Sequence, residues 1–207
     1  MRRQTLIKIA GLMRSELDSG FTILEISKRL GIGYRPAYNH IIAMNNEGII
    51  KVEKIGNAKQ CRLNLNSQKC RHLLEELDAA KKEEIYRKYP KIKAIIEDMI
   101  TKLTNDFVSD IHSIVLFGSY AKGLASKTSD IDLLFIVTDL KNRQLREGIE
   151  RESAGYMYSY SIKVSPMISD IGELKRMIKA PEMNVGKESR EHGISLYGSE
   201  MFWRIAV

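Results

Sequence analysis

Two short apolar runs near the middle of the chain constrain its fold more than any other feature. The first extends from Ser113 to Phe117 and is closed by Gly118, and the second extends from Ile131 to Val137. A short apolar run that ends at a glycine is typical of a buried strand followed by a tight turn. We therefore expect both runs to be buried strands.

Two carboxylates, Asp130 and Asp132, stand at the start of the second run. Because side chains alternate faces along a strand, both should point the same way, while Ile131 and Leu133 point into the core. A charge inside an apolar run is costly unless something such as a cation compensates it. Carboxylate oxygens suit Mg²⁺ or Mn²⁺. The spacing therefore predicts a metal site at Asp130 and Asp132.

The residues that follow the first strand suit a phosphate group. Gly118 would let the backbone approach a phosphate closely, and the Ser119 hydroxyl with neighbouring amides could bind its oxygens. Lys122 would add a compact positive charge.

Two metal ions about 3.5 to 4 Å apart would clamp the attacking and leaving oxygens of an in-line displacement at phosphorus.

The two segments, Leu116–Gly123 and Ser129–Leu134, resemble the signature of the minimal nucleotidyltransferases of the DNA polymerase β type. That signature is an apolar strand, Gly-Ser, a spacer, and Asp-x-Asp in a second strand. The resemblance implies a nucleotidyltransferase-like domain over residues 90–207, with a mixed β-sheet flanked by helices. It implies Mg²⁺ (or Mn²⁺) as cofactor and an NTP, with ATP expected, as substrate or ligand. The implied residues are Asp130 and Asp132 for catalysis and metal binding, and Gly118, Ser119 and Lys122 for the nucleotide phosphates.

One departure from this family bears on activity. Active members place a third carboxylate on a later strand, and the matching segment, Tyr160–Ile168, contains no acid. Ser165 stands about where the acid is expected, and serine binds Mg²⁺ poorly and is no base at neutral pH. Four acids lie nearby in the sequence, and each is explained as a helix-capping or surface residue: Glu150, Glu152, Asp170 and Glu173. Transferase activity is therefore left open.

The first third of the chain has a different organisation. Apolar spacing over residues 4–16 predicts a helix, and Thr22–Glu25 reads as a capping box that opens a second helix. Gly31–Gly33 is a short turn into a third helix, about Tyr34–Asn46. A helix, a glycine turn and a helix at this spacing form the helix-turn-helix pattern.

Two alternating runs, Ile49–Glu53 and Gln60–Leu65, predict a β-hairpin after the third helix. Residues 1–66 thus resemble a winged helix-turn-helix domain of small prokaryotic repressors. The same residues hold 11 Lys and Arg against 5 Asp and Glu. Because a basic excess suits a phosphate backbone, double-stranded DNA is the expected partner.

In such a domain the third helix enters the major groove of DNA. Arg35 could read guanine or contact a phosphate, and Asn39 could pair with adenine. The candidate DNA-binding residues are Tyr34, Arg35, Tyr38, Asn39 and His40 on the helix, with Lys54 and Lys59 beside the hairpin tip. A winged helix that serves dimerisation or protein docking remains the alternative.

Residues 67–89 predict a helical linker, because their apolar positions approximate one helical stripe. The linker could be a rigid spacer or an antiparallel dimer element. Since most winged-helix repressors bind two-fold DNA sites, a homodimer is expected.

Aromatic residues towards the end of the chain suggest two further features. Tyr156, Tyr158 and Tyr160 alternate, and they could offer one face for stacking a base, although a half-buried strand face is favoured. Phe202 and Trp203 are expected to pin the C-terminus to a core.

Composition agrees with two small domains of α+β class. The 207 residues are 43% hydrophobic and 29% charged, which is ordinary for a globular chain. No apolar run reaches the length of a membrane span, so we expect no membrane association and a cytoplasmic location. Cys61 and Cys70 are too few for a zinc cluster.

Three functions fit these patterns. The chain could be a metal-dependent transferase that moves a nucleoside monophosphate from an NTP to a hydroxyl on a protein or small molecule. It could be a transcription regulator whose nucleotidyltransferase-like domain only senses nucleotide, or an antitoxin-like module that binds a protein partner. The sequence favours a DNA-binding protein with a nucleotidyltransferase-family domain.

Overall fold

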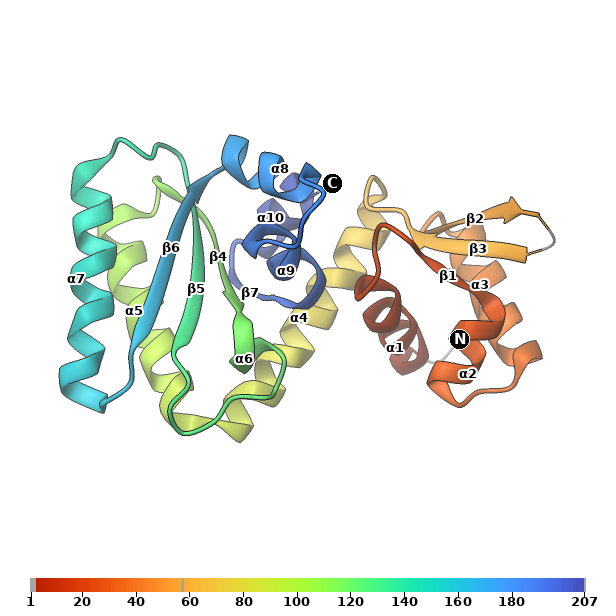
Figure 1. Cartoon of the computed structure of the whole chain (residues 1–207), viewed down its shortest axis with the longest axis horizontal. Coiled ribbons are helices and arrows are strands. Elements are labelled where there is room, and N and C mark those ends of the chain that lie inside the picture. Colours follow the sequence, from red (N-terminus) through yellow and green to blue (C-terminus); the bar gives the residue numbers. More distant parts are fainter. Residues whose placement is uncertain (1–2, 57, 207) are drawn as a thin grey trace. The chain divides into compact units, whose positions relative to one another are not determined.

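The computed structural model describes residues 3–56 and 58–206, which divide into two compact units (Figure 1). The N-terminal unit extends to Leu77, and the C-terminal unit runs from Asp78 to Ala206. The boundary lies inside helix α4, Gln68–Lys88. The segment 67–89, expected to be a separate linker, is therefore shared between the two units.

The N-terminal unit combines helices with a small antiparallel sheet. Its helices before α4 are α1 (Arg3–Arg14), α2 (Ile23–Leu30) and α3 (Tyr34–Asn46). Its strands are β1 (Phe21–Thr22), β2 (Ile50–Ile55) and β3 (Ala58–Leu63), in the order β1-β3-β2. The helices and the hairpin expected from the sequence are present within a few residues of their expected bounds.

Local chemistry fixes the two ends of α2. The Thr22 side chain accepts a hydrogen bond from the Glu25 amide, and the Glu25 carboxylate accepts one from the Thr22 amide. Both bonds satisfy amides that the first helical turn leaves without partners. At the other end Gly31 takes the left-handed conformation with φ 62° and turns the chain towards α3.

The C-terminal unit is a four-stranded mixed sheet between helices. Its sheet order is β6-β5-β4-β7, with β5 and β6 parallel and the other pairs antiparallel. The strands are β4 (Ile111–Phe117), β5 (Ile131–Val137), β6 (Val164–Asp170) and β7 (Ile194–Tyr197). The helices after α4 are α5 (Pro90–Phe107), α6 (Gly118–Ala121), α7 (Arg143–Tyr160), α8 (Ile171–Lys179), α9 (Val185–His192) and α10 (Ser199–Ile205).

Helices cover both faces of this sheet. Helices α5 and α7 lie on one face, and α8, α9 and α10 lie on the other (Figure 1). Leu133 and Phe135 pack in the cluster that contains the α5 and α7 side chains, whereas Leu134 and Ile136 are buried outside it. The second apolar run is therefore buried on both faces, and Asp130 and Asp132 interrupt it only at its first end.

The strand predicted at Tyr156, Tyr158 and Tyr160 is wrong, because all three residues belong to the last turns of α7. Tyr156 is buried and donates a hydrogen bond to Asp98 at 2.7 Å, whereas Tyr158 is 90% exposed. Residues four apart share a helical face, and the Tyr156 and Tyr160 ring centroids are 6.1 Å apart. Three alternating residues are too few to distinguish a helix from a strand.

The expected anchoring of the C-terminus is confirmed within the C-terminal unit. Phe202 and Trp203 are fully buried, and the Trp203 indole N–H donates to the Asp78 carboxylate at 2.9 Å. Across the residues that the structure describes, none of the helices is both long and apolar enough for a membrane span.

Candidate functional site

Gly118 brings the start of α6 against the acidic end of β5. It follows Phe117, which pairs with Asp132 across the sheet, and it has a φ of 68°. A β-carbon at this position would overlap the Asp132 carboxylate. Position 118 therefore requires glycine both for its backbone conformation and for its closeness to Asp132.

The two predicted carboxylates lie side by side but in different surroundings. One oxygen of Asp130, Oδ2, accepts hydrogen bonds from the Lys163 ammonium at 2.6 Å and from the Ser165 hydroxyl at 3.1 Å. The Lys163 ammonium, helped by Ser165, lowers the pKa of Asp130 below its ordinary value. Asp130 is therefore held in its charged form.

The pKa of Asp132 is shifted in the opposite direction. Its half-buried position raises the pKa of the Asp132 carboxyl, and the negative charges of Asp130 and Glu188 raise that pKa further. A cation placed against Asp132 would relieve this penalty. The electrostatics of the pair thus favour a positive ligand.

The position expected for a third acid is occupied by Ser165. Strand β6 runs parallel to β5, and its register places Ser165 opposite Asp132. Asp170, at the far end of β6, accepts a hydrogen bond from the Glu173 amide at 2.7 Å and caps α8. It therefore has the capping role expected from the sequence.

Asp130 and Asp132 offer a divalent cation two carboxylate ligands from the protein. Mg²⁺ commonly takes one or two carboxylates and completes its shell with water and substrate phosphates, so Asp130 and Asp132 would suffice for one ion. Within residues 3–56 and 58–206, no group of three His, Cys, Asp or Glu side chains could hold a metal. When bound, such an ion would neutralise phosphate charge and polarise the phosphorus that is attacked.

Lys122 is paired with an acid that the sequence did not reveal. Its Nζ lies 2.6 Å from Glu188 of α9, and both side chains are partly exposed. Glu188 is remote from Asp132 in sequence, and no local motif marks it. Only the packing of α9 beside α6 brings it to the site.

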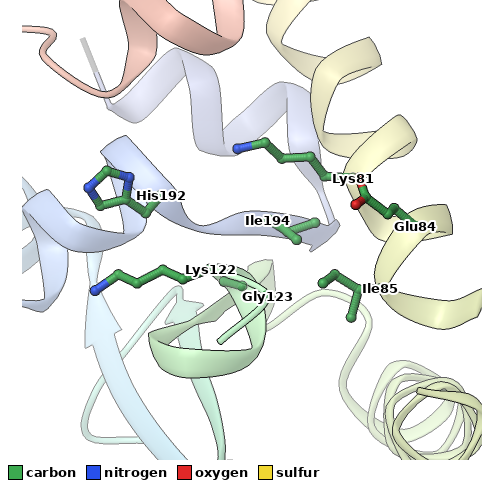
Figure 2. A pocket seen from close by; sticks show the side chains of 8 residues that line it. Lys81, Glu84, Ile85, Lys122, Gly123, His192 and Ile194 are labelled. Carbon is green, nitrogen blue, oxygen red and sulfur yellow. The ribbon is translucent and has the colours of Figure 1, made fainter. Parts of the chain in front are cut away.

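A cavity of about 310 Å³ lies beside Lys122 in the C-terminal unit (Figure 2). Lys81 of α4 and Lys122 extend their side chains in the same direction, and His192 of α9 lies on the side they approach. The lining residues are Lys81, Glu84, Ile85, Ala121, Lys122, Gly123, His192 and Ile194. Sequence analysis missed Lys81 and His192, because they come from elements that meet only in the folded chain.

The candidate DNA-binding residues occupy α3 and the β2-β3 hairpin. Tyr34, Arg35 and Asn39 are exposed, and Tyr38 and His40 are partly exposed. The Lys59 ammonium lies 5.1 Å from the Tyr38 ring centroid, and Lys59 pairs with Lys54 across the hairpin. The contact between Lys59 and Tyr38 therefore places the hairpin beside α3 in the N-terminal unit.

Residues 92–180 match a family model described as a nucleotidyltransferase domain. The match extends from α5 to just past α8 and contains Gly118, Asp130 and Asp132. This part of the chain is therefore similar to nucleotidyltransferase domains. The matched residues include the segment whose resemblance was evident from the sequence.

Two archaeal proteins are similar to part of this chain. One, provisionally named protein adenylyltransferase MJ1305 of Methanocaldococcus jannaschii, is 37% identical over 82 residues, which cover 39% of this chain and 56% of the relative. The other, provisionally named protein adenylyltransferase MJ0141 of the same organism, is 28% identical over 78 residues, which cover 38% of this chain and 79% of the relative.

Solved structures offer weaker likenesses. A toxin–antitoxin with AMP-PNP is 20% identical with a TM-score of 0.34, over 53% of this chain and 82% of that chain. A mutant of the toxin–antitoxin MntA–HpeT is 18% identical with a TM-score of 0.34, over 53% of this chain and 80% of that chain.

Proposed function

We propose that the nucleotidyltransferase domain binds an NTP, with ATP as the expected nucleotide, together with Mg²⁺ or Mn²⁺. The observation that carries the proposal is the approach of Gly118 to Asp132, with Asp130 on the same end of the sheet. Asp130 and Asp132 would hold the cation. Gly118 and Ser119 would bind the phosphates, and Lys122 would reach them after leaving Glu188.

The proposed reaction transfers a nucleoside monophosphate to a hydroxyl. The acceptor oxygen forms a bond to the α-phosphorus, the bond from that phosphorus to the bridging oxygen breaks, and pyrophosphate leaves with the electron pair. The acceptor proton passes to solvent. Positioning and electrostatic stabilisation would supply most of the catalysis, as is usual in phosphoryl transfer. The relatives named protein adenylyltransferases support ATP as donor and a protein as acceptor.

We also propose that the N-terminal unit is a winged helix-turn-helix that binds double-stranded DNA. Support comes from the order of its elements, from the turn between α2 and α3, and from the basic residues of the β2-β3 hairpin. Arg35 and Asn39 would face base edges, while Lys54 and Lys59 would contact phosphates. A homodimer would match a two-fold operator.

A second function is favoured by a specific observation. Ser165 stands opposite Asp132, and Lys163 already neutralises Asp130. A site built this way suits nucleotide binding more clearly than transfer. In this alternative the chain is a regulator that senses nucleotide or binds a protein partner in an antitoxin-like manner.

Label transfer separates the two functions. The full chain would be incubated with Mg²⁺ and ATP labelled either at the α- or at the γ-phosphate, with a broad set of candidate acceptor proteins. Transfer predicts α-label on protein, no γ-label, and loss of label with Asp132→Asn. Nucleotide binding without any α-label would favour the regulator.

A further inference from the structure

Lys163 lies where it can act as a built-in cation of the nucleotide site. The backbone fixes its position, because the Ile131 amide donates to the Lys163 carbonyl at 2.9 Å. The register then pairs Ile131 with Val164 and Asp132 with Ser165. Alternation along both strands therefore sends the Lys163 and Ser165 side chains to the face that carries Asp130 and Asp132.

The contacts at Asp130 leave less room for a metal ion than a pair of free carboxylates would. Both Lys163 and Ser165 donate to the same oxygen, Oδ2. An ion that used this oxygen would have to displace two donors, one of which carries a positive charge. The other positive side chain described near the site, Lys122, is paired with Glu188.

The net charge of the site differs from that of a three-carboxylate site. Three carboxylates carry a charge of −3, whereas Asp130, Asp132, neutral Ser165 and Lys163 together carry −1. The difference of two charges equals that of one divalent cation. One divalent ion therefore gives this site the same net charge that two divalent ions give to a site of three carboxylates, when the same nucleotide is bound to both.

We propose that Lys163 takes the place of a second divalent cation, so that this site holds one ion per chain. The inference rests on the proposed nucleotide site and specifies how that site is neutralised. It replaces the two-ion arrangement that the sequence analysis considered for this site. Lys163 would be a positioning residue that keeps Asp130 charged and oriented through Oδ2, while the other oxygen of Asp130, the Asp132 carboxylate and the phosphates meet the ion.

Electron paramagnetic resonance of Mn²⁺ tests this directly, because free and bound Mn²⁺ give different signals. The full chain would be titrated with Mn²⁺, first alone and then with saturating α,β-methylene-ATP. We expect one Mn²⁺ per wild-type chain. Lys163→Met should raise the Mn²⁺ affinity about tenfold, since it removes a positive charge a few ångströms from the ion. Lys127→Met, at an exposed lysine of the preceding loop, is the matched control.

The double variant Lys163→Met with Ser165→Asp restores three carboxylates and should bind two Mn²⁺. Two Mn²⁺ in the wild type would overturn the inference, as would equal affinities for the Lys163→Met and Lys127→Met chains. Because Mn²⁺ is first titrated without nucleotide, a failure of this inference can be distinguished from a failure of the proposed nucleotide binding. If the analogue fails to bind but Lys163→Met still tightens Mn²⁺, nucleotide binding is wrong and the role of Lys163 stands.

Discussion

Gly118 and Asp132 meet so closely that no side chain can be added at position 118 without moving the Asp132 carboxylate. Gly118 also has a φ of 68°, which only glycine adopts readily. The turn proposed to bind phosphate and the strand proposed to bind the cation are therefore fitted to each other at Gly118.

The first prediction compares two glycines. Gly123 has a φ of 69°, but a β-carbon added there would meet nothing within 4 Å. Gly123→Ala therefore tests the backbone cost alone, and it should lower the free energy of unfolding by about 1–2 kcal/mol. Gly118→Ala should cost about 1–3 kcal/mol more, because it also forces overlap with Asp132. Urea unfolding of both variants measures the difference. Equal losses would show that Asp132 is free to move away.

The second prediction concerns pH. The pKa of Asp132 is raised by burial, so its charge lowers stability at neutral pH, and this penalty fades as pH falls towards the unfolded value of about 3.9. Asp132→Asn should therefore raise the urea midpoint at pH 7, with a smaller gain near pH 4.5.

Asp130 should behave in the opposite way. Lys163 lowers the pKa of Asp130, so its charge stabilises the fold above about pH 3.9, and this stabilisation is lost as pH falls through the lowered folded pKa. Asp130→Asn should therefore reduce the urea midpoint slightly at both pH 7 and pH 4.5. The same direction of change in both variants at pH 7 would contradict the assigned electrostatics.

The third prediction concerns the pair formed by Lys122 and Glu188, whose charged atoms are 2.6 Å apart. Glu188→Gln should tighten ATP binding, because it releases the Lys122 ammonium for the phosphates. Lys122→Gln should weaken binding about tenfold, the value of one hydrogen bond to a charged group. Fluorescent-nucleotide displacement provides the measurement, with Lys127→Gln as control. A Lys122→Gln chain that binds as tightly as the control would remove Lys122 from the site.

The fourth prediction concerns DNA. If Lys54 and Lys59 contact phosphates, changing either to Ala should reduce the slope of log affinity against log salt by about 1. Fluorescence anisotropy with a generic duplex at several salt concentrations measures it. Lys69→Ala, at an exposed lysine of α4, should leave the slope unchanged. Equal slopes for all four chains would exclude the hairpin from DNA binding.

Sequence patterns were sufficient where the interactions are local. The Thr22–Glu25 capping box, the turn at Gly31 and the two buried strands each depend on a few neighbouring residues, and each is present in the structure. The alternation of side chains along a strand likewise predicted that Asp130 and Asp132 share a face. The position of Ser165 followed from the resemblance to the nucleotidyltransferases, and it agrees with the strand register.

Contacts between distant segments could not be read from the sequence. Glu188 reaches Lys122 only because α9 packs near α6, and Lys163 reaches Asp130 only because β6 lies parallel to β5. The alternating tyrosines of α7 were misassigned because the pattern was too short to define its period. Pairings of this kind depend on the tertiary arrangement, which local spacing does not encode.

Calorimetric titration of Mg²⁺-ATP into the wild-type chain and into Asp132→Asn tests the central claim most directly. Binding can be measured without knowing the acceptor, and the variant is expected to be folded and somewhat more stable at pH 7. Saturable binding to the wild type that is lost in Asp132→Asn is the predicted result. Equal binding by both chains, or no binding of any of the four NTPs by the wild type, would contradict the account.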